Sequence, residues 1–484
     1  MLKKMLITAG IILFFQASLF SNTGEPDAIE QKIIFHTFNE EFDQARAICL
    51  DQIKLNPNIP KYYYYLINVK VIEYYQKVRE LKPENRSEGR KVLNKEIIDY
   101  TESVIDKFDI SKLDINNKFY LGMIQGYLAR IYGVDGSWWS AFKSGKKSKN
   151  IMEDILKADP NFFDAYLALG MIYYYADRMS GITSFIAGIL GLPGDREKGL
   201  NYLQLAYQKG KLTYGQSALT LCEVYSSLEG NDFASIPYYE AFLKQYPKNR
   251  RTLSSYINTL MNIWDYKKIE TLIKNDKLNM VDDLMKARFN DMRGEKESAV
   301  RFAEKALQNE NLLFRGGDNS ARYIITFNSW LLGDNNRIKK YEPLLNTDSK
   351  ERFALIKNNE KAGRWLYDLS VKIASDKPYN ETEMHLSLKP DFSNQKVLEN
   401  QYNLLSGAFY FKSNQYDKSE SFLLAALQSG SDREKNTSGK YLIEIYMRQY
   451  KDKNKVKKLL DLIDDMDNDQ LKYRSKDLEK KYNL

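Results

Sequence analysis

Residues that commonly carry out acid–base, nucleophilic or metal chemistry are scarce in this sequence. Its 484 residues include only two His and two Cys, so a four-ligand zinc site would need carboxylates as well. His36 and His385 lie far apart, and no Cys-x-x-Cys, His-Glu-x-x-His or Gly-x-Ser-x-Gly motif occurs. We therefore predict no catalytic residue, no bound metal and no cofactor.

One segment has a superficial likeness to a phosphate-binding loop, residues 144–148 (SGKKS). A true loop has a second Gly five residues before the Gly of its Gly-Lys pair, and Ser or Thr directly after that Lys. These two positions hold Ser140 and Lys147. The segment is better explained as the basic first turn or flank of a helix. Acidic pairs such as Glu40-Glu41 are adjacent, so on a helix they point in different directions and form no catalytic geometry.

The thiols and the net charge limit the possible partners. Cys49 and Cys222 each lie in a helical pattern among apolar neighbours, which favours two small core residues over a disulfide. The formal net charge is +8, and no dense basic run or nucleic-acid reader motif occurs. We therefore expect no nucleic-acid partner.

The elements that position these residues are predicted to be helices. Gly (25) and Pro (11) are few for this length, whereas Tyr (35) and Phe (23) are many. The apolar share of 43% and the charged share of 28% are globular values, which exclude wholesale disorder and a polytopic membrane protein. Length alone suggests about three domains, although a repeat array can use the same length as one continuous body.

Internal repetition is the most informative feature. In residues 163–173, the side chains of Tyr166, Leu169, Gly170 and Tyr173 follow the spacing i, i+3, i+4 and i+7, which places them on one helical face. The small Gly170 lets a second helix approach closely, and the flanking aromatic side chains fill the remaining space. The same pattern predicts further packing positions at Gly199, Ala206, Ala287, Ala299, Ala306, Gly407, Tyr410 and Ala426.

These spacings resemble the tetratricopeptide repeat, which has about 34 residues. The match is clearest at 163–173 and is good at 281–308 and 398–428. Between 116 and 250, the order of Trp139, Gly145-Lys146-Lys147, Asp159-Pro160 and Gly194-Asp195-Arg196 is similar to that in a group of exported bacterial tetratricopeptide proteins with no assigned activity. The resemblance implies an all-α, right-handed solenoid of helix-turn-helix pairs and export from the cytoplasm. It implies no catalytic residue.

Residues 1–21 have the order of a secretory signal. Lys3 and Lys4 precede an apolar run from Met5 to Phe15, and small residues follow before position 22. We therefore predict a signal peptide and an exported protein, periplasmic or envelope-associated if the source is bacterial. The alternative is an uncleaved N-terminal anchor, because the segment lacks a clean Ala-x-Ala cleavage site.

The predicted domain organisation follows from the repeats. After the signal peptide, we expect a repeat array over 22–310, a degenerate helical region over 311–395 and C-terminal repeats over 396–484. Two insertions are expected to interrupt the first array, at 133–145 and 178–194.

The two insertions are the predicted partner-binding features. The first contains Trp138 and Trp139, whose indole rings give large contact area at low entropic cost, although one of such a pair is commonly core. The second is apolar from Met179 to Leu192 and too short for an ordinary membrane span. It is either tucked against the repeats or exposed as a contact patch. The patch would present Phe185, Ile186, Ile189 and Leu190.

Two runs of tyrosine circle their helices, Tyr62–Tyr65 and Tyr173–Tyr175, so we expect part of each run to leave the core. Helix packing is one explanation of these runs, and an aromatic lining of a concave groove is the other. His36 is interpreted as a packing residue between helices.

The sequence favours an exported, non-catalytic scaffold that binds protein or peptide partners through its concave face and its insertions. The alternative is a peripheral membrane-associated envelope assembly factor that uses residues 179–192 as its membrane-surface contact. An enzyme is disfavoured by the missing nucleophile, metal and phosphate motifs.

Overall fold

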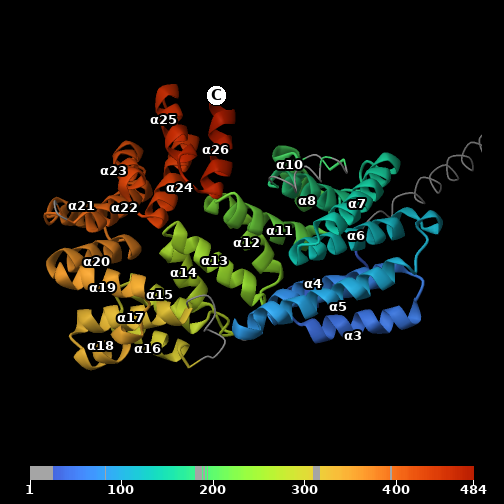
Figure 1. The fold of residues 1–484 in the computed structure, drawn as a ribbon, viewed down its shortest axis with the longest axis horizontal. Helices are drawn as coiled ribbons and strands as arrows, with labels where there is room; N and C mark the ends of the chain where they lie inside the picture. The colour runs from blue at the N-terminus through green and yellow to red at the C-terminus, as the bar shows by residue number, and fades with distance from the viewer. Residues whose placement is uncertain are drawn as a thin grey trace, which may run out of the picture. The chain divides into compact units, whose positions relative to one another are not determined.

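The computed structural model describes residues 25–81, 83–179, 188, 191–192, 194–308, 317–392 and 395–484. Within these residues the chain consists of helices and short connections, with no strand (Figure 1). It divides into two compact units. Unit 1 comprises Met1–Leu221 and Ala241–Asn249, and unit 2 comprises Cys222–Glu240 and Arg250–Leu484. The predicted signal peptide, 1–21, lies outside the described residues.

The helices of unit 1 pack mainly against their neighbours in the chain. Helix α11 and helix α12 each contain a boundary between the units. The helices are α2 (Ala28–Phe38), α3 (Phe42–Leu55), α4 (Pro60–Glu80), α5 (Arg86–Ile105), α6 (Ile115–Asp135), α7 (Trp138–Ala158), α8 (Ala165–Asp177), α10 (Arg196–Lys209), α11 (Tyr214–Glu223) and α12 (Asp232–Gln245).

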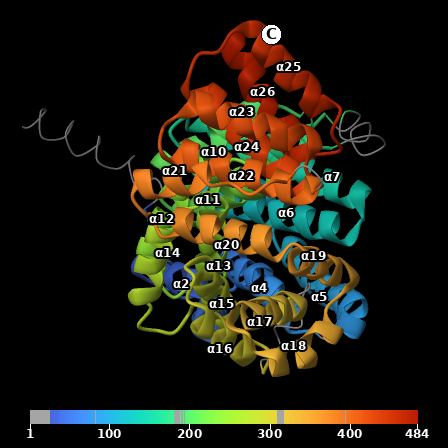
Figure 2. The same cartoon turned by 90° about the vertical axis from the view of Figure 1, so that its left-hand side faces the viewer.

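Unit 2 is also built of helices, many of which pack against their neighbours in the chain (Figure 2). A π-helical turn, η3 (Val224–Leu228), follows α11. The helices are α13 (Arg250–Asn262), α14 (Tyr266–Lys274), α15 (Asp283–Met292), α16 (Lys296–Ala306), α17 (Gly317–Leu332), α18 (Asn335–Tyr341), α19 (Thr347–Asn358), α20 (Glu360–Ala374), α21 (Tyr379–Ser387), α22 (Lys396–Lys412), α23 (Tyr416–Ser429), α24 (Asp432–Arg448), α25 (Lys453–Asp464) and α26 (Asp469–Tyr482).

Six helix pairs share one turn: α2–α3, α6–α7, α13–α14, α15–α16, α17–α18 and α22–α23. In each, a residue with positive φ lies two positions before the second helix. The next N–H donates to the carbonyl oxygen five residues earlier, over 2.8 to 3.0 Å. This is the hydrogen bond of a Schellman motif, which ends one helix and aims the chain back along it. The positive-φ residues are Glu40, Gly136, Trp264, Gly294, Gly333 and Asn414.

This repeated turn confirms the predicted all-α fold of helix-turn-helix pairs. It also explains residues 133–145, which we expected as an insertion. Helix α6 continues to Asp135 and α7 begins at Trp138, so this segment holds the same turn as the other pairs, at Gly136. The predicted degenerate region, 311–395, is helical in its described part and contains α17 to α21.

Close backbone approach holds α8 against α10. A Cβ atom added to Gly170 would lie 2.8 Å from the backbone nitrogen of Leu203, and one added to Gly199 would lie 2.6 Å from the nitrogen of Tyr174. No side chain fits at either position without moving a helix backbone. Two other pairs have a buried Ser that donates to a Gly carbonyl oxygen on the partner helix. These are Ser148 to Gly122 and Ser419 to Gly407, each over 2.8 Å.

The structure places the positions predicted for helix packing as follows. Tyr166 is half-buried, and its ring centroid lies 4.8 Å from that of Tyr202. The buried ones are Leu169, Gly170, Tyr173, Gly199, Ala206, Ala287, Ala299, Ala306, Gly407, Tyr410 and Ala426.

The expectation that part of each tyrosine run leaves the core was wrong for Tyr62–Tyr65. All four side chains are buried, because α4 contacts α2, α3, α5 and α6 and has no open face there. Their hydroxyls need partners inside the protein. The hydroxyls of Tyr65 and Tyr120 both donate to the buried carboxylate of Glu30. Glu30 also accepts from the backbone N–H of Asp27 in a capping box at the start of α2.

Both cysteines are core residues, as predicted. Cys49 and Cys222 are buried and free, and burial raises the pKa of the Cys49 thiol to about 12. A thiol with so high a pKa carries almost no thiolate at neutral pH and is a poor nucleophile.

Two glycine substitutions test the close approach of α8 and α10. We predict that Gly199→Ala lowers the free energy of unfolding by about 1–3 kcal/mol, because the new methyl group collides with the backbone of α8. Gly145→Ala, in α7, should raise it by about 0.5–1 kcal/mol, since its nearest neighbour would be Leu192 at an ordinary 3.8 Å. Denaturant unfolding of both variants measures the effect. If both substitutions changed the free energy of unfolding in the same direction, the predicted collision with the α8 backbone would be contradicted.

Candidate binding surfaces

Helix α7 carries two exposed tryptophans at its start. Trp138 is 41% exposed and Trp139 is 54% exposed, whereas Trp264 and Trp330 are buried. An indole ring that is exposed to solvent on an otherwise packed helix often marks a contact surface.

Lysines continue this exposed face along α7. Lys143, Lys146 and Lys147 are exposed, and Trp139, Lys143 and Lys146 follow the spacing i, i+4 and i+7 that places them on one side of the helix. Among the described residues, none of the three lysines has an ion-pair partner, whereas Lys149 on the same helix pairs with Glu153 at 2.9 Å. We call Trp138, Trp139, Lys143, Lys146 and Lys147 the α7 stripe.

The second predicted insertion, residues 178–194, has both of its ends close to the α7 stripe. The ring of Trp138 lies 6.4 Å from that of Phe142, and buried Phe142 packs with Leu192, Met179 and Ile172. Met179 and Leu192 are the two ends of the apolar segment; Leu192 is buried, and Met179 is partly buried against the same cluster. The residues predicted as its contact patch, Phe185, Ile186, Ile189 and Leu190, lie outside the described residues.

Unit 1 also has a groove that sequence reasoning missed. It has a volume of about 570 Å³ and is lined by apolar side chains, among them Ile34, Phe35 and Tyr246, and by polar ones that include Lys32 and Lys211. Phe35 is 43% exposed. No local pattern could have found the groove, because it joins α2 to residues roughly 180 to 210 positions later in the chain.

Both histidines contact neighbouring groups within their own unit. His36 lies at the end of α2, where Nδ1 is 2.7 Å from a carboxylate oxygen of Glu41 in the turn to α3. The imidazole of His385 stacks on the indole of Trp365 with ring centroids 4.6 Å apart. Its Nε2 lies 3.1 Å from the carbonyl oxygen of the same Trp365.

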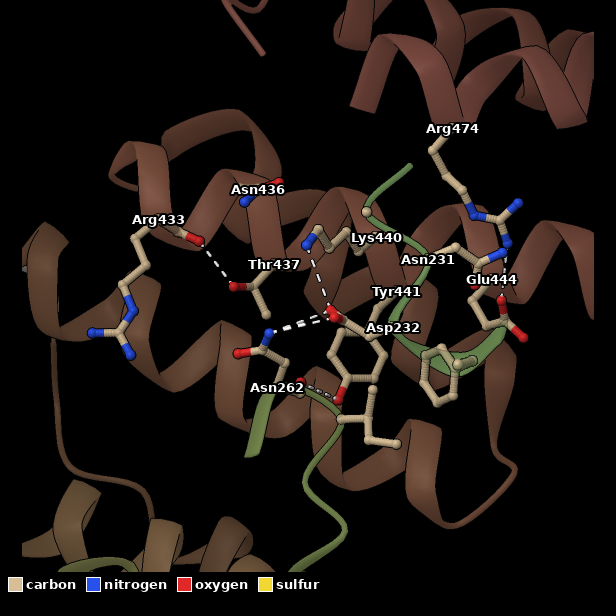
Figure 3. A pocket seen from close by; sticks show the side chains of 13 residues that line it. Asn231, Asp232, Asn262, Arg433, Asn436, Thr437, Lys440, Tyr441, Glu444 and Arg474 are labelled. Carbon is tan, nitrogen blue, oxygen red and sulfur yellow. Dashed lines mark hydrogen bonds and ion pairs between the residues drawn. The ribbon is translucent and has the colours of Figure 1, made fainter. Parts of the chain in front are cut away.

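Unit 2 contains a small polar pocket of about 160 Å³, which is shown in Figure 3. The carboxylate of Asp232, at the start of α12, lies inside it. Asp232 accepts from Lys440 Nζ at 3.5 Å and from Asn262 Nδ2 at 3.4 Å. Burial raises the pKa of Asp232, while the charge of Lys440 and the hydrogen bond from Asn262 oppose the rise.

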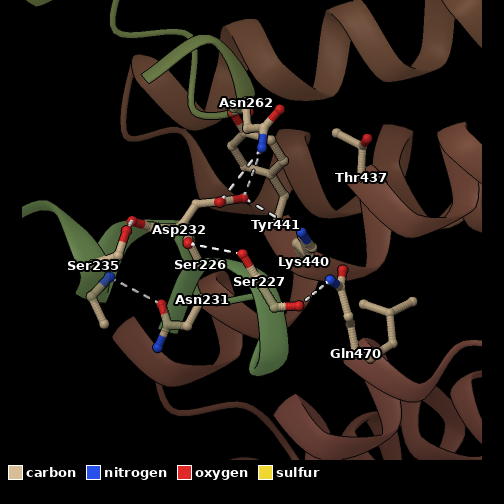
Figure 4. A network of polar contacts seen from close by, with 12 residues as sticks. Ser226, Ser227, Asn231, Asp232, Ser235, Asn262, Thr437, Lys440, Tyr441 and Gln470 are labelled. Carbon is tan, nitrogen blue, oxygen red and sulfur yellow. Dashed lines mark hydrogen bonds and ion pairs between the residues drawn. The ribbon is translucent and has the colours of Figure 1, made fainter. Parts of the chain in front are cut away.

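Hydrogen bonds around the pocket connect distant parts of unit 2, as Figure 4 shows. The hydroxyl of Tyr441 donates to the carbonyl oxygen of Asn262 at 3.2 Å, and Gln470 Nε2 donates to that of Ser227 at 2.6 Å. Residues 179 and 243 positions apart are thereby joined. The Asp232 carboxylate is held by Lys440 and Asn262, so the geometry of the pocket fits a structural junction between α24, α26 and the start of α12.

Two further observations concern the described residues only. No three His, Cys, Asp or Glu side chains gather there as a candidate metal site. None of the helices there is both long enough and apolar enough to cross a membrane.

The junction predicts a pH-dependent stability. Lys440→Met leaves the buried Asp232 carboxylate without its cation, so we expect the free energy of unfolding to fall by about 2 kcal/mol at pH 7. With its raised folded pKa, Asp232 favours folding only when protonated, and this contribution is lost as the pH rises through that pKa. The loss in the variant should therefore shrink as the pH falls toward about 4.

Denaturant unfolding at both pH values measures this difference. Lys458→Met, a change of the same kind at an exposed lysine of α25, is the control and should have little effect at either pH. If Lys440→Met lost the same free energy of unfolding at pH 7 and at pH 4, then Asp232 would not be the group that Lys440 stabilises.

Comparisons with known proteins add little to this geometry. No family model and no curated protein matches the chain. Among solved structures, the chain is similar to one in the crystal structure of the APC/C hetero-tetramer Cut9-Hcn1, at 10% identity and a TM-score of 0.21. The match covers 96% of this chain and 97% of that chain. A likeness this weak carries no argument, so the description as helix-turn-helix pairs rests on the repeated turns described above.

Proposed function

We propose that this protein is an exported, non-catalytic scaffold that binds a protein partner through the α7 stripe of unit 1. The observation that carries the proposal is the exposure of Trp138 and Trp139 on a helix whose opposite face is packed in the core. Export is supported by the order of charged, apolar and small residues in 1–21. A further contact through the concave face stays a prediction.

The energetics of the stripe fit a contact surface. About half of each indole is open to water, and covering that area on binding contributes about 1–2 kcal/mol for each ring. Tryptophan loses little rotamer entropy when it is fixed in an interface. The pair can therefore supply the apolar centre of a small interface without any change in the fold of unit 1.

The lysines indicate the charge of the partner. Lys143, Lys146 and Lys147 are exposed beside the indole rings and have no ion-pair partner among the described residues. Charges at the rim of an interface select partners and speed association more than they add affinity. We infer a partner surface with an apolar contact for the indoles and acidic side chains around it.

The alternative is attachment to an anionic membrane surface. Tryptophan and lysine on one helix face also occur in helices that bind membrane interfaces. Apolar residues between Met179 and Leu192 follow in the sequence, and the ends of this segment pack beside the stripe. The two candidates differ in what the stripe contacts, so one set of variants separates them.

The test replaces both indoles. We expect Trp138→Ser/Trp139→Ser to keep the circular dichroism spectrum and to lose cross-linked partners from an envelope fraction. About half of each side chain is exposed, so their loss costs the fold little. Quantitative mass spectrometry of the cross-linked proteins compares the variant with the wild type. Leu55→Ser is the control, because Leu55 is an apolar residue of unit 1 that is 73% exposed and lies outside the stripe.

Two outcomes would contradict the proposal. Recovery of the same partners by the wild type and the double variant would show that the stripe is not the contact. Flotation of the wild type, but not of the double variant, with protein-free vesicles containing anionic lipid would assign the stripe to a membrane surface instead.

A further inference from the structure

The groove of unit 1 is not used by the proposed function. Its lining residues come from three segments, within 26–35, 211–215 and 245–246, and all of them belong to unit 1. Its volume of about 570 Å³ lies within the range of about 300–1,000 Å³ that is usual for a site that holds one small molecule. We call it the α2 groove.

One face of α2 lies along this groove. Ala28, Gln31, Lys32 and Phe35 all line it, and their spacing of i, i+3, i+4 and i+7 places them on the same side of the helix. The opposite face of α2 is in the core, where Ile33 is buried. Phe35 is nevertheless 43% exposed, so the groove leaves apolar surface in contact with water. Covering that surface with an apolar ligand is favourable.

Contacts inside unit 1 fix the walls of the α2 groove. Asn249 Nδ2 donates to the carbonyl oxygen of Phe38 at 2.7 Å, and the backbone N–H of Lys248 donates to Asn39 Oδ1 at 2.9 Å. The ring centroid of Phe38 also lies 5.0 Å from that of Tyr246. The end of α2 and the segment after α12 are therefore held together before any ligand binds, which lowers the entropic cost of binding.

The wall of the groove contains a buried hydroxyl without an acceptor. Tyr246 lines the groove and is 2% exposed. Among the described residues, its hydroxyl makes no hydrogen bond, whereas the buried hydroxyl of Tyr65 donates to Glu30. Burial raises the pKa of Tyr246, so the phenol stays protonated and is a donor at neutral pH. A buried donor without an acceptor is costly, and an oxygen atom of a ligand removes that cost.

The charged residues that line the groove are positive. They are Lys32 and Lys211, and no Asp or Glu lines it within the described part of the chain. Lys32 is exposed and has no ion-pair partner among the described residues. Lys211 pairs with Glu25 at 2.5 Å, but both side chains are at least half exposed, and such an ion pair contributes little to stability. A ligand anion can therefore replace Glu25 beside Lys211.

We propose that the α2 groove binds a long-chain carboxylate, the anion of a fatty acid. The aliphatic chain covers the phenyl ring of Phe35 and the apolar side chains beside it, the carboxylate pairs with the lysines, and Tyr246 supplies a donor for an oxygen atom. A short carboxylate lacks the apolar chain, and an aliphatic amine lacks the negative charge. This inference concerns other residues of unit 1 than the α7 stripe and does not depend on it.

Titration calorimetry of the full chain with dodecanoate at pH 7.5 tests the proposal. We expect the wild type to bind dodecanoate saturably at one site per chain. Butyrate and dodecyltrimethylammonium should each bind at least tenfold more weakly. In Lys32→Glu, the affinity for dodecanoate should fall at least tenfold, because a negative charge then replaces the unpaired cation at the groove.

Tyr246→Phe separates a role in ligand binding from a structural one. We expect this variant to bind dodecanoate about threefold to tenfold more weakly, because one hydrogen bond to the ligand is lost. Without ligand, its Tm should equal or exceed that of the wild type, since the hydroxyl has no protein partner to lose. A hydroxyl with a structural role alone would instead lower the Tm when removed and leave the affinity for dodecanoate unchanged.

Two controls complete the experiment. Lys91→Glu, the same change at an exposed lysine of α5 outside the groove, should bind dodecanoate as the wild type does, and so should Trp138→Ser/Trp139→Ser. Loss of binding in the tryptophan variant but not in Lys32→Glu would place the site at the α7 stripe and refute the proposal.

Four other results would also overturn it. They are the absence of saturable binding, equal affinity of the wild type and Lys32→Glu for dodecanoate, and equal affinity of the wild type for dodecanoate and dodecyltrimethylammonium. The fourth is tighter binding of the peptide acetyl-Leu-Phe-Leu-Asp than of dodecanoate, which would assign the groove to a peptide.

Discussion

The close approach of paired helices is the constraint on which the rest of this structure depends. A Schellman turn ends one helix and reverses the chain within two or three residues, so the next helix starts directly beside the first. Helix axes this near need small residues where they cross. Gly170 and Gly199 provide this between α8 and α10, and a hydroxyl such as that of Ser148 satisfies a carbonyl oxygen on the partner helix elsewhere. The aromatic side chains then fill the space beside the small residues.

The sequence predicted the parts of the fold that depend on local spacing. The pattern of Tyr166, Leu169, Gly170 and Tyr173 predicts one packed helix face, and the structure has a helix with Leu169, Gly170 and Tyr173 buried there. The segment around Gly136 was harder, because its glycines and tryptophans read as an insertion. The signal that could have identified it is the position of Gly136 two residues before a new helix, which recurs at Gly294 and Gly333.

Features that depend on long-range contacts could not be predicted in this way. Tyr62–Tyr65 are all buried because four other helices surround α4. The periodicity of a helical segment does not indicate how many other helices will pack against it. The junction of Asp232 with Lys440 joins residues that are 208 positions apart. No window of the sequence contains both partners, so only the folded chain brings their charges together.

The buried carboxylate of Glu30 has a consequence for any truncation of the N-terminal segment. It satisfies the hydroxyls of Tyr65 and Tyr120, and the capping box with Asp27 holds it at the first turn of α2. The start of the described chain is therefore tied into the polar contacts of the unit 1 core. A protease that removes residues upstream of Asp27 leaves these contacts intact. Trimming beyond Glu30 would leave two phenol groups in the interior without their acceptor, so unit 1 tolerates the loss of N-terminal residues only as far as this first turn of α2.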